Sequence, residues 1–441
     1  MTYDNRPGGT AMEQYQKQLA DGVELMVNRT DKFKTGLLSV TLTAPLRRET
    51  ATAGALIPEV LFRGSRNYPD MERLSAAADA LYGASLGPAV RQRGESQCVS
   101  FLCGVIDDRY ALDGSAVLEP AAALMGEVLL DPATQGGLFR WDYVKGEGAN
   151  LADRIRSRVN DKRSWSIFRL VQEMCAGEAY AVDKLGDADE GSSMTPDRLW
   201  EAYQRLLRDS KVTFYYGGSA HPDRVEETVR RVFAPLTQGR TAPVECEVIG
   251  SPREPVRTVT DAMDVTQGKL AMGFRTGGVT LAGPDYPALL VFNALYGGSA
   301  NSRLFLNVRE KLSLCYYASS MIDKLKGLMV VSSGVEFADF DRAQEAILEQ
   351  LEELRQGKFS EDELNAAIRC VVNGLRGRLD SQGQMEDDCV TKLICGQSPD
   401  DGAALIRAVE RVTAEQAAQV ARQVRLDTVY RLTGKEDARR G

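Results

Sequence analysis

The order of predicted secondary-structure elements occurs twice along the chain, and this repetition limits the possible folds more than any other feature. Each half gives strands, a pair of helices, two further strands, long helices and a final strand. Between the halves, segment 234–256 is rich in proline, glycine and polar residues, as interdomain linkers are. We predict two α+β domains of similar build, 1–233 and 257–441. In the first, strands 22–28 and 36–43 are expected to form a hairpin.

Two short sequence matches support a duplication. Val60–Ser65 is similar to Ala294–Ser299, at an offset of 294 − 60 = 234, and Val212–Gly218 is similar to Thr428–Gly434, at an offset of 428 − 212 = 216. Because the two offsets differ, the loops of the two halves must differ in length.

The chain has a single histidine, His221, among its 441 residues. A zinc site that needs two imidazoles from one chain is therefore excluded. His221 lies in a loop before a proline, and no sequence motif pairs it with an acid that would orient its ring. This is typical of an exposed polar residue rather than a catalytic base. The net charge of −8 has the wrong sign for neutralising phosphates, so we expect no nucleic-acid partner.

The eight cysteines are scattered, without a C-x-x-C pair, and are expected to be free thiols in a reducing compartment. The first residues contain no apolar signal region, and no apolar run approaches the roughly 20 residues that a membrane span needs. We therefore expect a cytoplasmic protein without membrane association.

Motifs for nucleotide binding and for serine hydrolysis are not supported. Neither G-x-x-x-x-G-K-[ST] nor G-x-G-x-x-G occurs, so a nucleotide cofactor is not expected. Gly83–Gly87 matches G-x-S-x-G, but a predicted helix precedes it and a strand follows, the reverse of a nucleophile elbow.

Segment 54–65, G-A-L-I-P-E-V-L-F-R-G-S, resembles the zinc helix of the M16 metallopeptidase family, which includes pitrilysin, insulinase and the mitochondrial processing peptidase. That helix typically reads A-H-F-L-E-H-M-L-F-K-G-T, and H-x-x-E-H supplies two histidine ligands and a glutamate that activates water. Here Leu56 and Val60 occupy the histidine positions and only Glu59 remains. Since hydrocarbons cannot ligate zinc, the resemblance implies that this chain has no catalytic residue in its own zinc site and binds no metal there.

The distal metal ligand of the family, a glutamate, also has no clear counterpart. Segment 149–155 resembles that region and places Asp153 or Arg154 at the ligand position, where an arginine would repel a cation. An independent metallopeptidase with unrecognised ligands would need a different donor set.

Residues 293–320, N-A-L-Y-G-G-S-A-N-S-R-L-F-L-N-V-R-E-K-L-S-L-C-Y-Y-A-S-S, resemble the second-domain signature of the same family. The signature has a glycine turn, S-R-L-F and R-E-K-x-G-L-x-Y, and Ser313 stands where glycine is usual. In active members its arginine and tyrosine reach the substrate and the developing oxyanion, and Arg309 and Tyr316 correspond to them. The alternative is that Arg309 is a surface charge and Tyr316 a core-facing strand residue.

A chain that keeps the second signature and lacks the first resembles the inactive bacterial subunits of two-chain M16 peptidases. The resemblance implies two homologous LuxS/MPP-like domains, each a mostly antiparallel sheet backed by helices. It also implies a heterodimer with an H-x-x-E-H-bearing subunit that carries the zinc, and a peptide substrate bound in trans by Arg309 and Tyr316. The alternative is a non-catalytic peptide-binding or scaffolding homodimer with no role in proteolysis.

Overall fold

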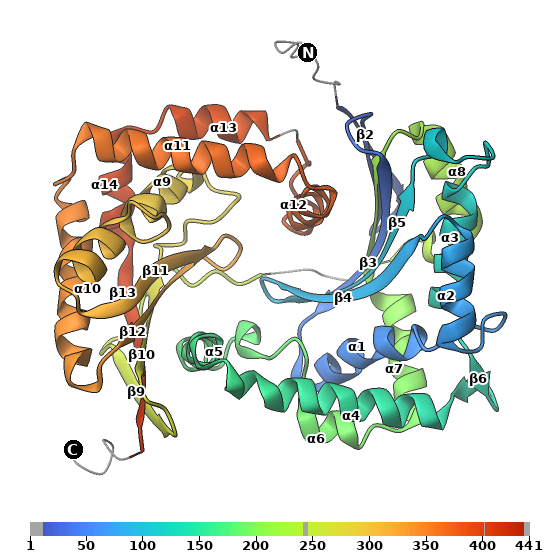
Figure 1. The fold of residues 1–441 in the computed structure, drawn as a ribbon, viewed down its shortest axis with the longest axis horizontal. Helices are drawn as coiled ribbons and strands as arrows, with labels where there is room; N and C mark the ends of the chain where they lie inside the picture. Colours follow the sequence, from blue (N-terminus) through green and yellow to red (C-terminus); the bar gives the residue numbers. More distant parts are fainter. Residues whose placement is uncertain (1–11, 241–245, 401, 436–441) are drawn as a thin grey trace. The chain divides into compact units, whose positions relative to one another are not determined.

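The computed structural model describes residues 12–240, 246–400 and 402–435. The chain forms two compact units, each assembled from separate stretches of sequence (Figure 1). Unit 1 comprises Met1–Arg156, Val182–Glu245 and Ser381–Asp401; unit 2 comprises Ser157–Ala181, Cys246–Asp380 and Gly402–Gly441. Part of the predicted linker 234–256, namely residues 241–245, lies outside the described residues. The boundaries 1–233 and 257–441 stay a prediction for the two repeated halves of the sequence.

Unit 1 is built on a sheet with the strand order β1-β2-β8-β3-β5-β4. Neighbouring strands are antiparallel except β2 and β8. The hairpin predicted from strands 22–28 and 36–43 is wrong, because β8 lies between β2 and β3 and pairs with both. The strands are β1 (Glu13–Ala20), β2 (Val23–Arg29), β3 (Thr35–Pro45), β4 (Ser85–Arg93), β5 (Ser96–Ile106) and β8 (Lys211–Gly218), with a separate short ribbon of β6 (Thr134–Gln135) and β7 (Leu138–Phe139).

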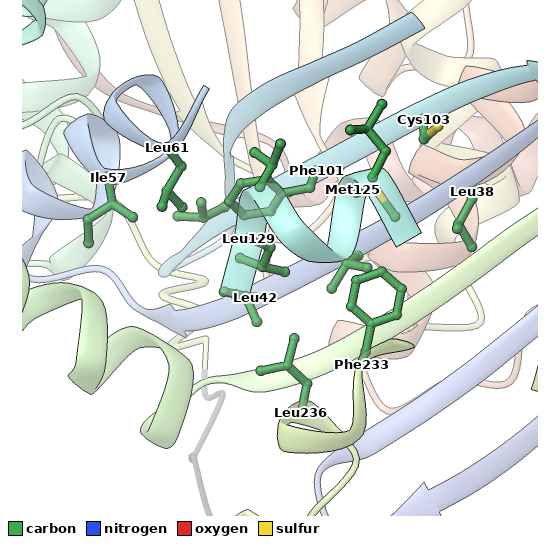
Figure 2. Packing of buried hydrophobic residues seen from close by; sticks show 14 of the residues in the cluster. Leu38, Leu42, Ile57, Leu61, Phe101, Cys103, Met125, Leu129, Phe233 and Leu236 are labelled. Atoms are coloured by element: carbon green, nitrogen blue, oxygen red, sulfur yellow. The ribbon is translucent and has the colours of Figure 1, made fainter. Parts of the chain in front are cut away.

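Helices from the first half of the chain cover one face of this sheet. Apolar side chains at helical spacing on α3 pack against alternate residues of the strands, which point to the same face. Figure 2 shows Met125 and Leu129 of α3 beside Leu42 and Phe101 from the sheet. The helices are α1 (Arg48–Leu61), α2 (Met71–Ala80), α3 (Leu118–Leu130), α4 (Trp141–Ser157), α6 (Ala188–Ser192), α7 (Pro196–Asp209) and α8 (Pro222–Val232).

A helix from the second half of the sequence, α12 (Gln382–Ile394), packs against the sheet of unit 1. Its Met385 and Cys389 form a buried cluster with Met26 and Tyr215 of the strands. Glu386 of the same helix is fully buried, pairs with Arg91 at 2.7 Å and accepts a hydrogen bond from Ser39 at 3.1 Å. The side chains of β2 and β8 alternate between the two faces, so both faces of this sheet need apolar cover.

Unit 2 repeats the plan with a sheet of order β11-β12-β10-β13-β9, in which β13 and β9 are the parallel pair. The strands are β9 (Arg257–Met263), β10 (Gly268–Arg275), β11 (Cys315–Asp323), β12 (Leu328–Val335) and β13 (Arg425–Gly434). The helices from the second half are α9 (Tyr286–Tyr296), the π-helix η5 (Leu304–Lys311), α10 (Phe340–Arg355), α11 (Glu361–Arg378), α13 (Ala403–Glu410) and α14 (Ala414–Gln423).

A helix from the first half of the sequence, α5 (Lys162–Met174), packs against the sheet of unit 2. Its Leu170 lies in a buried cluster with Ala271 of β10 and Tyr430 of β13. Each unit therefore contains one helix from the other half of the sequence.

Four buried charged groups lie where the segment after α5 meets the sheet of unit 2. Arg275 donates to Glu178 at 2.6 Å and pairs with Asp427 at 3.3 Å, and Lys326 donates to Glu178 at 2.8 Å. Their side chains are between 0% and 7% exposed, so these ion pairs are desolvated and depend on one another.

The structure confirms the predicted α+β class and the two similar, mostly antiparallel domains. No helix among the described residues is long and apolar enough to cross a membrane.

Candidate functional site

Helix α1 carries the residues at the zinc-ligand positions of the family, and its sequence makes it a core helix. Ten of its fourteen residues are buried. Leu56 is 0% and Val60 3% exposed, and both belong to the main apolar cluster of unit 1. Their side chains are packing groups, so neither position presents a donor atom to a metal.

Glu59 is partly exposed and is held by a cation. Its Oε1 accepts from Nη1 of Arg154 on α4 at 2.8 Å, with the two side chains 28% and 46% exposed. The neighbouring Asp153 is exposed. An arginine thus stands against the one retained residue of the H-x-x-E-H pattern, where the family has a metal.

These residues do not fit a zinc ion. The two histidine positions are hydrocarbons, and the retained Glu59 is paired with the guanidinium of Arg154, which repels a cation. In the described part of the chain, no group of three or more histidine, cysteine, aspartate and glutamate side chains is arranged to hold a metal.

The purified protein is expected to contain substoichiometric zinc, and dialysis against a chelator is expected to leave its thermal unfolding midpoint unchanged. A structural zinc ion contributes folding free energy, so its removal would lower the midpoint. Atomic absorption and a thermal melt with and without the chelator measure both quantities; a stoichiometric ion or a lower midpoint would contradict the donor chemistry described above.

The second signature forms a helix–turn–helix–strand unit in unit 2, and glycine makes its turn possible. After α9, a Cβ on Gly297 would lie 2.7 Å from the backbone nitrogen of Ser320 in β11, closer than real Cβ atoms approach. Ser320 in turn donates from Oγ to Asn293 of α9 at 2.7 Å. The turn therefore fixes the end of α9, and with it the start of η5, against β11.

The two arginines of this signature have different surroundings. Arg303 is 14% exposed and pairs with Glu353 of α10 at 2.6 Å and with Glu363 of α11 at 2.9 Å. It anchors the start of η5. Arg309, at the other end of η5, is 37% exposed and pairs with its exposed chain neighbour Glu310 at 2.9 Å.

Arg309 and Tyr316 lie in direct contact. Nε of Arg309 donates to the carbonyl oxygen of Tyr316 at 2.9 Å, and its guanidinium lies 4.6 Å from the centre of the Phe305 ring. Tyr316 is 60% exposed, and its hydroxyl donates to Oε1 of Glu336 at 2.5 Å. This hydrogen bond raises the pKa of Tyr316, and the phenol is protonated at neutral pH as an ordinary tyrosine is, so it is available as a donor. The side chain of Tyr316 is not part of the core.

Glu336 is a site residue that sequence reasoning missed. It directly follows β12, which pairs with β11 so that Val335 lies opposite Cys315. The register shifts between Cys315 and Tyr317, and at this irregularity the side chain of Tyr316 reaches Glu336. The sequence predicted the two strands, and their pairing would have placed Tyr316 near the end of β12. The identity of its partner, Glu336, follows only from the strand register.

Ser313 occupies a backbone conformation that favours glycine. Its φ is 51°, in the left-handed region, at the position where the family signature usually has glycine. The residue lies in the turn between η5 and β11, so this conformation helps to place Tyr316 relative to Arg309.

Replacing Ser313 by glycine is expected to raise the free energy of unfolding by about 0.5–1 kcal/mol, because the strain of a left-handed non-glycine residue exceeds the extra unfolded-state entropy of glycine. Urea denaturation measures the change. Ser313→Ala, which keeps the Cβ and loses only the hydroxyl, is the matched control and should not be stabilised. Equal behaviour of the two variants would contradict the explanation.

The structure places Leu56, Glu59 and Val60 in unit 1 and Arg309 and Tyr316 in unit 2. His221 is the N-cap of α8, where its Nδ1 accepts from the amide of Asp223 at 3.4 Å. This is a structural role at a helix end.

Comparison with known proteins agrees with these features. The model for the Peptidase M16 inactive domain matches residues 193–370. The chain is 33% identical over 417 residues to the probable inactive metalloprotease YmfF of Bacillus subtilis (strain 168), with 95% of this chain and 97% of that protein covered. It is 22% identical to an uncharacterized zinc protease of Streptomyces coelicolor, with 92% and 86% covered.

Solved structures share the fold. A crystal structure of a conserved protein from Enterococcus faecalis V583 has a TM-score of 0.88 at 28% identity, covering 96% of this chain and 99% of that one. The peptidase M16 inactive domain from Pseudomonas fluorescens has a TM-score of 0.77 at 17% identity, covering 96% and 98%. With its aliphatic residues at the zinc-ligand positions and its full-length likeness to an inactive relative, the chain belongs to the M16 peptidase family, as a member of the non-catalytic type.

Proposed function

We propose that this chain is the non-catalytic subunit of a two-chain M16 peptidase that processes peptides. In this proposal an H-x-x-E-H-bearing partner holds the zinc, and Arg309 and Tyr316 of this chain bind the peptide and stabilise the oxyanion in trans. The observation that carries the proposal is the exposed contact between Arg309 and Tyr316, in a chain whose own α1 offers no metal ligands.

The surroundings of Arg309 suit a substrate-binding role. One nitrogen is anchored on the carbonyl of Tyr316, and the Phe305 ring supports the guanidinium plane, which fixes the direction of the side chain. Its ion pair with the exposed Glu310 costs little to break. Nη2 has no partner among the described residues, so the guanidinium keeps donors for a carbonyl or carboxylate oxygen.

The hydrogen bond from Tyr316 to Glu336 requires a switch of partner during the reaction. A phenol that donates to a carboxylate cannot donate its one proton to an oxyanion at the same time. Since the hydroxyl is exposed, an arriving substrate can displace Glu336. The phenol carries its proton at neutral pH with or without this hydrogen bond, so it can donate to an oxyanion once the substrate has displaced Glu336.

The proposal predicts that Arg309→Ala lowers kcat/KM of the reconstituted pair by about 10²–10³-fold, the loss measured for single donors to a developing oxyanion. The assay mixes this chain with an H-x-x-E-H-bearing M16 chain recovered with it from its host and follows cleavage of a quenched fluorescent peptide. Arg342→Ala, which removes an exposed arginine of α10, is the matched control and should keep full activity.

Two outcomes would count against the proposal. If the partner alone cleaves as fast as the mixture, this chain does not take part in turnover. If the Arg309→Ala variant retains turnover and still forms a complex in size-exclusion chromatography, this chain acts as a peptide-binding or scaffolding protein instead. Tyr316→Phe distinguishes the contribution of the phenol from that of Arg309. It removes the phenol donor and leaves the backbone carbonyl that holds Arg309.

A further inference from the structure

Unit 1 contains a pocket of about 560 Å³ that the proposed function does not use. It lies between α1, the C-terminal half of α7 and the end of β3, and its lining excludes the positions that correspond to the zinc site. The pocket has the volume of a small-molecule site. Its apolar wall comes from both helices and from the strand end, namely Pro45, Ala53, Ile57, Ala202 and Leu206.

The charge around this pocket opposes that of the whole chain. Four arginines line it, Arg47, Arg205, Arg208 and Arg240, against the single acid Asp209. Four positive charges and one negative charge leave a net +3 at the pocket, in a chain of net charge −8. Arg208 is paired with Asp209 at 2.7 Å, whereas Arg47 and Arg205 are exposed and have no ion pair among the described residues.

Two buried polar atoms at the pocket have no hydrogen-bond partner in the described part of the chain. They are Oγ of Ser210, a residue 1% exposed, and Nε of Arg240, a residue 9% exposed. The other guanidinium nitrogens of Arg240 donate to the backbone oxygens of Leu207 and Pro235, which hold the group in place. Buried donors without acceptors are costly and call for a bound group that supplies the acceptor.

The beginning of α1 adds to the positive potential. Its N-cap is Arg47, whose side chain does not cap the helix, and the following Thr50 also lines the pocket. The N-terminal end of a fourteen-residue helix carries a partial positive charge, which favours an anion there.

We propose that this pocket binds a small organic anion, a carboxylate with an apolar body. The carboxylate accepts from Ser210, Arg240 and the exposed arginines 47 and 205, and the apolar body covers the wall formed by α1 and α7. A bare inorganic anion would leave that wall wet, and an uncharged apolar molecule would leave the arginines unpaired. A fatty acid and the C-terminus of an apolar peptide share this chemistry.

The test is isothermal titration of the whole protein with octanoate and with N-acetyl-Leu-Leu, each compared with its uncharged amide, and with inorganic phosphate. Both acids are candidates, and the tighter one identifies the source. The amides and phosphate are expected to bind at least about tenfold more weakly, because each lacks one half of the recognition.

The double variant Arg47→Ala/Arg205→Ala is expected to weaken binding of the preferred acid by about tenfold or more, and Ser210→Ala by severalfold. Both arginines are exposed, so the fold should persist, and an unchanged thermal midpoint verifies this. Arg198→Ala is the matched control: it removes an arginine at the other end of α7 that pairs with Glu190. The proposal is overturned if neither acid binds, if amide or phosphate binds as tightly as the acid, or if the double variant binds like the wild type.

Discussion

Replacing Arg275 by methionine is expected to lower the free energy of unfolding of unit 2 by about 3–5 kcal/mol, the usual cost of breaking a buried ion pair from one side. The substitution keeps most of the side-chain volume but leaves two buried carboxylates, Glu178 and Asp427, with Lys326 as the remaining cation close to Glu178. It also removes the hydrogen bond to the backbone oxygen of Met174 at the end of α5.

Tryptophan fluorescence can assign this loss to unit 2. The chain has three tryptophans, at 141, 165 and 200, and only Trp165 falls within the segments of unit 2. It lies on α5, the helix that the charged cluster anchors. In a Trp141→Phe/Trp200→Phe background, urea titration should show the early loss of the Trp165 signal in Arg275→Met. Arg342→Met, at an exposed pair, should change little; a shift below about 1 kcal/mol in Arg275→Met would contradict the prediction.

The same cluster predicts that the free energy of unfolding falls at acid pH. Burial of Glu178 opposes its ionisation, but the hydrogen bonds from Arg275 and Lys326 outweigh this and hold the pKa of Glu178 below its usual value. A carboxyl whose folded-state pKa is lowered contributes stability above its unfolded pKa, about 4.3, and this contribution is lost as the pH falls through the folded pKa. The wild type should therefore lose stability below about pH 4.3. In Glu178→Gln the free energy of unfolding should depend less steeply on pH in this range.

The second large effect is expected in unit 1, where Arg91→Met should cost about 3 kcal/mol or more. Glu386 of α12 is fully buried, and this change removes its ion pair with Arg91 while the hydrogen bond from the hydroxyl of Ser39 remains. Asp387, the partner of the neighbouring Arg93, is 29% exposed, so Arg93→Met serves as a matched control with a smaller loss.

A double variant makes this prediction specific. Arg91→Met/Glu386→Gln removes the stranded charge, so it should recover much of the stability lost in Arg91→Met. Urea titration with Trp165→Phe, which leaves the two tryptophans of unit 1 as probes, gives the three free energies. If the double variant is no more stable than Arg91→Met, the buried carboxylate is not the cause.

Local patterns in the sequence predicted most individual elements, but not all their partners. The first of the predicted pair of helices is α1, whose sequence is apolar on nearly all sides, and ten of its fourteen residues are buried. The same local information joined β2 to β3, whereas the inserted β8 comes from a distant segment. In the same way, the apolar face of α5 indicates that it is covered, but not by which sheet.

In the candidate site, too, local sequence identified the residues but not their contacts with distant segments. Leu56 and Val60 could be recognised because both ligand positions lie on one helix with fixed spacing, and Arg309 and Tyr316 because they share one short motif. The contact of Arg154 with Glu59 brings together α4 and α1, and that of Glu336 with Tyr316 depends on strand register. Neither is encoded by spacing along the chain.

The exchange of α5 and α12 between the two halves of the sequence has a consequence for synthesis on the ribosome. The sheet of unit 1 receives α12 only after residue 394 has been translated, although its last strand, β8, ends at Gly218. During that interval Met26 and Tyr215 lack the cover they have in the folded chain. We therefore expect the first half to complete its packing only when nearly the whole polypeptide has been made, and fragments cut between the halves to fold fully only when both are present.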